Sequence, residues 1–172
     1  VASCRKGWHL LSICAGCYPP SKEFEPYLMS YCEKNSKDVN EVIQKFAKYT
    51  MMKVRRTMEQ GPRKYTPTGI EIEAAKYARP VTVRVYLLDR TFVTVPVEAW
   101  TTGAELNAMV AEKLKIQEPE PFATFEVSTT DEERALDQDE RVLDVLASWQ
   151  RSFDEDKAKN KPRSATSAQI GK

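Results

Sequence analysis

Apolar side chains recur at helical spacing up to about residue 79 and then, from Val81 onward, alternate with polar ones as they do in strands. The first part therefore predicts four helices, at about residues 7–16, 21–34, 38–60 and 68–77. Pro19-Pro20 and Gly61-Pro62 separate them. Thr68 and Glu71 have the spacing of a capping box, which marks the start of the fourth helix.

The third predicted helix is amphipathic. Its apolar arc consists of Val39, Val42, Ile43, Phe46, Ala47, Tyr49 and Val54. The opposite arc carries four cations, which are Lys45, Lys48, Arg55 and Arg56. Lys53 falls inside the apolar arc, so we expect either a bend in the helix or a side chain whose stem is buried.

The second part of the chain predicts a small β-rich unit. Strands at 81–87 and 92–97 flank a tight connection at Asp89-Arg90 and read as a hairpin. A helix capped by Thr102 and Glu105 follows. A strand at 122–127, a short segment near 135–136 and a closing helix at 142–149 complete the order of a ubiquitin-like β-grasp. The predicted fold class is therefore α+β, with a helical unit before the β-grasp unit.

The balance of basic and acidic residues changes at the same point in the chain. Residues 1–80 carry 14 Lys and Arg against 8 Asp and Glu, whereas residues 81–150 carry 6 against 14. Such asymmetry predicts two units with different partners. We expect a helical unit at 1–79, a ubiquitin-like unit at 80–150 and a flexible polar linker at 151–172. The chain lacks an initiating Met, and we expect it to be a piece of a longer one.

Catalysis and metal binding have little support in the sequence. Cys14 and Cys17 form one CxxC, but no second pair or close histidines complete a zinc site, so we interpret the cysteines as small core side chains. His9, the only histidine, lies beside Trp8 on an apolar helix and is more typical of a core or rim position than of a catalytic base. Phosphate-binding and dinucleotide-binding glycine patterns are missing. We expect no enzyme, no cofactor and no metal.

Several short motifs resemble a known tandem of domains. In the helical unit these are the basic-Gly-Trp-x-Leu-Leu run at 6–11, Cys14, Pro19-Pro20-Ser21, the turn at 61–63 and the Pro-x(3)-Glu-x-x-Ala pattern at 67–74. They resemble the second half of a myosin tail homology 4 (MyTH4) domain. The segments 86–92, 101–102 and 143–149 resemble the ubiquitin-like first lobe of a FERM domain, which follows a MyTH4 domain in that family.

The resemblance implies a function in the tail of a motor protein. Such tandems occur in unconventional myosins, of which class VII looks most similar, and in a plant-type kinesin. It implies a non-catalytic segment that binds cargo, scaffold, filaments or the motor's own head, with any ATPase in a motor domain elsewhere and further FERM lobes packing on this one. We expect a cytoplasmic, cytoskeleton-associated protein, in actin-rich projections such as filopodia for a myosin. A motor-less FERM adaptor at the membrane cortex is the alternative.

The basic arc is the candidate binding site. By the same resemblance, Lys45, Lys48, Arg55 and Arg56, together with Arg63 and Lys64 beyond the glycine turn, are expected to meet an acidic protein partner, such as a microtubule surface or an acidic scaffold segment. The alternative is a solvated helix face. Nucleic acid is a weaker candidate, because the net charge is only +1 and exposed aromatics do not interleave with the cations. We predict no transmembrane segment, because no apolar run approaches about 18 residues.

Overall fold

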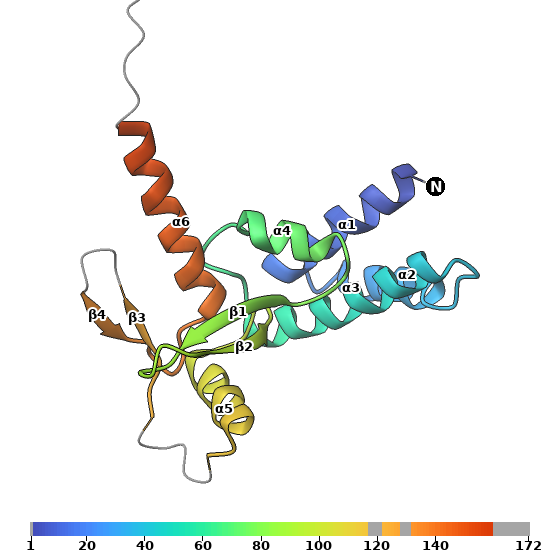
Figure 1. Ribbon diagram of the computed structural model, residues 1–172. Coiled ribbons are helices and arrows are strands. Elements are labelled where there is room, and N and C mark those ends of the chain that lie inside the picture. The colour runs from blue at the N-terminus through green and yellow to red at the C-terminus, as the bar shows by residue number, and fades with distance from the viewer. Residues whose placement is uncertain (1, 117–121, 128–131, 160–172) are drawn as a thin grey trace, which may run out of the picture.

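The structure, a computed structural model, describes residues 2–116, 122–127 and 132–159 (Figure 1). The helical unit consists of α1 (Ala2–Cys17), α2 (Glu25–Asn35), α3 (Glu41–Gln60) and α4 (Gly69–Ala75). The second unit consists of β1 (Val81–Tyr86), β2 (Phe92–Val97), α5 (Gly103–Leu114), β3 (Phe125–Val127), β4 (Glu133–Ala135) and α6 (Val142–Lys159). The α+β class is confirmed, as is the change from helices to strands near Pro80.

Helix α3 is the centre of the helical unit, and α1 and α2 pack against it. It begins at Asn40, whose side-chain oxygen accepts the backbone N–H groups of Val42 and Ile43. The buried cluster of this unit contains Trp8, Ala15, Leu28, Cys32, Phe46, Ala47 and Val54. The predicted apolar arc of α3 is therefore largely right. Val39 and Val42 are the exceptions: Val39 precedes the capping residue and is fully exposed, and Val42, in the first turn, is 45% exposed.

Helix α2 buries a narrower stripe than its sequence predicted. Leu28 and Cys32 are buried, whereas Phe24 and Tyr31, which have compatible spacing, are more than half exposed. The reason is that α2 contacts the unit mainly through α3. Tyr31 instead stacks on Trp8 of α1, with ring centroids 5.3 Å apart. One row of side chains is enough to attach α2 to its neighbours.

The strands pair as two separate antiparallel hairpins. In the first, Val81 lies opposite Val97 and Tyr86 opposite Phe92. In the second, β3 pairs with β4. Within the described residues the two hairpins are not joined into one sheet. The element order of a β-grasp is present, but the continuous sheet of that fold is not formed in this part of the chain.

Strand β3 is shorter than the predicted 122–127 and its apolar residues face outward. Phe125 and Val127 are more than half exposed, while Glu126 between them is partly buried. Glu126 accepts hydrogen bonds from Arg134 on β4 and, at 3.0 Å, from the indole Nε1–H of Trp149 on α6. These polar contacts determine which face of the strand points inward.

Helix α5 starts against the loop that leads into α6. Its capping box is confirmed, with Thr102 accepting the N–H of Glu105. The free N–H groups of Gly103 and Ala104 donate to the carbonyl oxygens of Glu140 and Gln138 at 2.9 and 3.0 Å. The core of this unit consists of Val81, Val95, Val97, Leu106, Leu136, Val142, Leu143 and Val145. It also includes Ala74 of α4, so the two units share one buried cluster.

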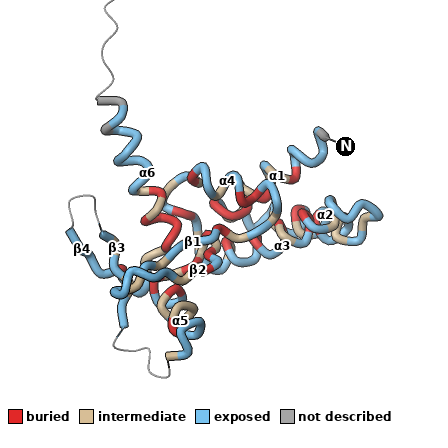
Figure 2. Tube along the Cα trace, in the orientation of Figure 1, coloured by how far each residue is buried: buried red, intermediate tan, exposed pale blue. Residues whose placement is uncertain are grey.

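Helix α6 extends ten residues past the predicted end at 149. The expected linker at 151–172 is therefore wrong for 151–159, where the chain is helical, and its remainder lies outside the described residues. Arg151 pairs with Glu155 at 3.4 Å one turn later, and the Lys157 ammonium lies 4.4 Å from the ring of Phe153. Figure 2 shows that only the end of α6 nearest the first hairpin is buried.

Candidate protein-binding surface

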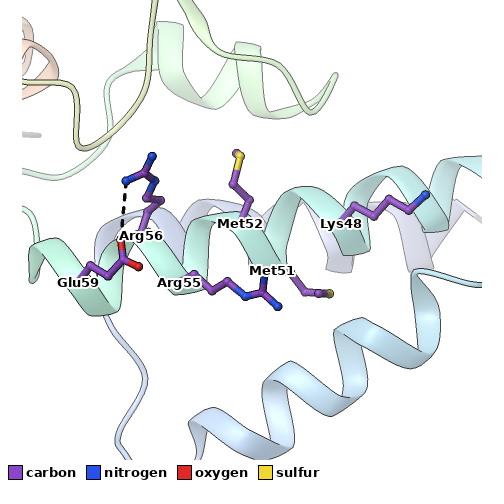
Figure 3. A pocket seen from close by; sticks show the side chains of 6 residues that line it. All are labelled: Lys48, Met51, Met52, Arg55, Arg56 and Glu59. Atoms are coloured by element: carbon purple, nitrogen blue, oxygen red, sulfur yellow. Dashed lines mark ion pairs between the residues drawn. The ribbon is translucent and has the colours of Figure 1, made fainter. Parts of the chain in front are cut away.

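The outer face of α3 carries exposed cations around an exposed methionine. Lys48, Met52, Arg55 and Glu59 recur at the spacing of one helix face. Together with Met51 and Arg56 they line an open depression of about 310 Å³ (Figure 3). We call these six residues the α3 surface. Such a mixture offers positive charge and a small apolar contact within one helix length.

The cations of the α3 surface differ in the contacts that they make within the chain. Arg56 lies 3.7 Å from Glu59 and 5.9 Å from the ring centroid of Trp100, which follows β2 in the second unit. Within the part of the chain that the structure describes, neither Lys48 nor Arg55 takes part in an ion pair. These two side chains are therefore available to an acidic partner.

Two other predicted site residues lie apart from this surface. Lys45 is exposed, but its Nζ donates to the carbonyl oxygen of Tyr77 at 2.7 Å and so ties α3 to the connection before β1. Lys64 is also exposed, and its ammonium lies 5.3 Å from the ring of Tyr65. Neither residue lines the depression. Their role in binding stays a prediction.

Arg63, in contrast, is buried, so its assignment to an exposed basic site is wrong. Its side chain is 1% exposed and forms ion pairs with Glu71 of α4 and Asp144 of α6. The Nε–H donates to Asp144 Oδ1 at 2.9 Å; Nη2 lies 2.9 Å from the same oxygen without hydrogen-bond alignment, so that contact is ionic. Burial acts to lower the pKa of Arg63, but the two carboxylates together raise it.

The turn after α3 explains why Arg63 points inward. Gly61 has φ +77°, a left-handed conformation that glycine adopts without strain. The chain then runs back toward α1, and the Arg63 backbone N–H donates to the Cys17 carbonyl at 2.9 Å. A basic residue beyond a glycine turn looked like an extension of the basic arc. Its two carboxylate partners lie 8 and 81 residues further along the chain, and no local pattern connects them.

A second arginine joins the units from the other side. Arg141, just before α6, donates to the carbonyl oxygens of Pro62 at 3.0 Å and of Gln60. These carbonyls lie at and just beyond the end of α3, where the helix dipole is negative and a cation is favourable. Arg63, Glu71, Asp144 and Arg141 form what we call the junction. It fixes α3 relative to the second unit.

Lys53 is a buried charge close to the junction. It is 8% exposed, and its ammonium lies 4.6 Å from the centre of the Tyr49 ring. Burial lowers the pKa of Lys53, against the opposing effect of Glu98 and other anions. Burial likewise raises the pKa of Glu98, which Lys53 partly offsets. The expectation that the Lys53 stem would be buried is correct, but the ammonium is buried with it.

The described residues offer little for other chemistry. They contain no group of three or more potential metal ligands. Cys17 and Cys32 are buried, as predicted for core side chains, whereas Cys4 and Cys14 are exposed. Burial raises the pKa of Cys32 to about 11, which keeps the thiol protonated and unreactive. His9 is half-buried, with Nε2 3.1 Å from the Ile72 carbonyl. No described helix is long and apolar enough to span a membrane.

Comparisons with known proteins match both units. Residues 1–74 match the MyTH4 domain family and residues 79–168 match the RA like domain family. Unconventional myosin heavy chain 6 of Caenorhabditis elegans is 32% identical over 123 residues, 72% of this chain and 6% of that protein. The kinesin-like protein KIN-14E of Arabidopsis thaliana is 30% identical over 165 residues, 88% of this chain and 13% of that protein.

A solved structure has the same fold. The MyTH4-FERM MF1 domain of Dictyostelium discoideum myosin VII superposes with a TM-score of 0.79 at 21% identity, over 88% of this chain and 31% of that one. The chain thus spans a small part of the proteins that it resembles. The arrangement of a helical unit followed by a β-containing lobe is common to both structures.

Proposed function

Because the chain belongs to the RA like domain family, with a MyTH4 segment preceding that domain, we propose that it is a non-catalytic, protein-binding segment in the tail of a cytoskeletal motor. Its task is to recognise an acidic surface on a cargo, scaffold or filament, or on the motor's own head, through the α3 surface. It would work in the cytoplasm, associated with the cytoskeleton. The motor's ATPase would lie elsewhere in the parent protein.

The unpaired cations of α3 are the observation that carries this proposal. Lys48 and Arg55 form no ion pair among the described residues, whereas the neighbouring Lys45 and Arg56 have partners within the chain. Exposed charges of one sign accelerate the encounter with an oppositely charged partner and give binding that weakens with salt. The junction also supports this proposal, because it holds α3 in a fixed orientation. Less conformational entropy is then lost when a partner binds.

The proposed parent motor is a myosin or a kinesin, and each would bring the chain close to a different filament. Both kinds of motor are among the relatives of this chain. A kinesin tail would bring the α3 surface to the acidic exterior of microtubules. A myosin tail would use it for an acidic cargo or scaffold protein, in actin-rich projections. A FERM adaptor without a motor remains the alternative and would act at the membrane cortex.

Co-sedimentation of the full chain with microtubules and with actin filaments, at 50 and 150 mM salt, tests the proposal. The decisive variant carries Lys48→Glu, Arg55→Glu and Arg56→Glu. Its matched control carries Lys22→Glu, Lys34→Glu and Lys37→Glu, which are exposed residues near α2 and change the net charge equally. The two variants differ in where the charge is reversed, not in how much.

We expect salt-dependent binding that the α3 variant weakens about tenfold or more and that the control variant largely retains. Pelleting with microtubules rather than actin would favour the kinesin reading. If neither filament binds, the same variants are tested for capture of acidic scaffold proteins. Equal loss in both variants would mean that only the total charge matters, and the α3 surface would not be a binding site.

A further inference from the structure

Met52 is the unexplained residue on the α3 surface. The residue is 39% exposed and lies on the same helix face as Lys48, four residues before it, and Arg55, three residues after it. Met51 beside it also lines the depression but packs against the core of the helical unit, whereas Met52 points to the side of α3 on which Arg56 lies (Figure 3). Met52 makes the centre of this surface apolar.

We propose that the partner of the α3 surface is an acidic protein segment that carries one bulky apolar side chain, which packs on Met52 while flanking carboxylates pair with Lys48 and Arg55. This rests on the proposed function and specifies its ligand. Positions three and four residues apart on a helix are neighbours, so Lys48 and Arg55 lie about one turn to either side of Met52. Methionine is flexible and polarisable, and it adapts to differently shaped apolar groups.

Charge complementarity decides among the possible occupants. The cations require an anionic ligand, but Glu59 lies within the same depression and opposes a continuous phosphate backbone. A purely acidic polymer would pair with the cations and leave Met52 in water. An acidic segment with a bulky apolar residue would use both features of the surface, so it is the occupant that the residues match best.

Two fluorescent peptides of equal charge test the inference. Each has four glutamates on either side of one central residue, which is phenylalanine in the first and serine in the second. Their affinities for the full chain are measured by fluorescence anisotropy at 50 mM salt. We expect the phenylalanine peptide to bind about tenfold more tightly, the factor expected from partial burial of one aromatic ring.

Variants of Met52 locate the preference. Met52→Gln should reduce it to about twofold and leave the affinity for the serine peptide unchanged, while Met52→Leu should retain it. Ile70→Gln is the matched control, because Ile70 is also an exposed apolar residue but lies on α4. It should have no effect on the preference for the phenylalanine peptide. Circular dichroism checks that each variant is folded.

Each remaining outcome has a defined meaning. If both peptides bind equally well, or if Met52→Gln keeps the preference, the inference is wrong and the proposed function stands. If neither peptide binds, both fail. If sedimentation reveals a dimer of the chain that Met52→Gln dissociates, the apolar contact belongs to a second copy and the inference is overturned.

Discussion

Replacing Arg63 with alanine tests the junction most sharply. The substitution leaves Glu71 and Asp144, whose side chains are 9% and 12% exposed, without the cation between them. Removing one member of a buried ion pair costs about 3–5 kcal/mol, because the remaining charge stays desolvated. Glu71 keeps two other contacts, from the N–H and the hydroxyl of Thr68 at 2.7 and 3.0 Å. We therefore expect the lower end, about 3 kcal/mol.

Urea unfolding followed by circular dichroism measures this free energy, and calorimetry should show Tm falling by roughly 6–12 °C for a chain of this size. Lys64→Ala is the control, because its side chain is exposed and should change stability by less than about 0.5 kcal/mol. The double variant Arg63→Met with Asp144→Leu should recover part of the loss, since an apolar pair needs no ionic partner. A loss below about 1 kcal/mol in Arg63→Ala would mean that the two buried ion pairs contribute little to stability.

Three further substitutions probe other parts of the fold. Lys53→Met should stabilise the chain by about 1 kcal/mol at pH 7, because it removes a buried charge. The unfolded chain holds the Lys53 proton more tightly than the folded chain, so the stability of the wild-type protein rises as the pH approaches 10.5. Urea titrations should therefore show that the difference in stability between the two proteins shrinks over this pH range. Thr102→Ala should cost about 1 kcal/mol by removing the cap of α5, seen as a lower Tm in calorimetry; an unchanged Tm would mean that the loop carbonyls suffice. Gly103→Ala should destabilise the chain by roughly 1–3 kcal/mol, because the new Cβ would collide with the Asp137 carbonyl oxygen. Gly7→Ala, with open space around it, should stabilise the chain by about 0.5–1 kcal/mol. Equal effects of the two substitutions in urea unfolding would contradict this.

Local patterns in the sequence were enough to predict most elements and the outer face of α3. Periodicity and capping boxes depend on residues within one or two turns, so Thr68 and Thr102 were correctly placed at helix starts. The exposed face of α3 follows from helix geometry alone. The spacing of Met52 from Lys48 and Arg55 also places it on that face, but charge alone does not reveal an apolar residue there.

The contacts between the units could not be predicted in the same way. Arg63 looked like part of a basic surface until its partners Glu71 and Asp144 were in place. The burial of Lys53 and the outward turn of Phe125 have similar causes, since each depends on neighbours that are distant in sequence. A buried charge is tolerated only in a specific three-dimensional setting, and a single sequence does not display that setting.

An NMR titration of the full chain with the acidic phenylalanine peptide tests the binding site directly. Backbone amide shifts are followed residue by residue at 50 mM salt. We expect the largest changes along residues 48–59 of α3 and smaller ones near Trp100. These changes should disappear when Lys48, Arg55 and Arg56 are changed to glutamate. Largest changes on β3, β4 or α6, with α3 unaffected, would contradict this expectation.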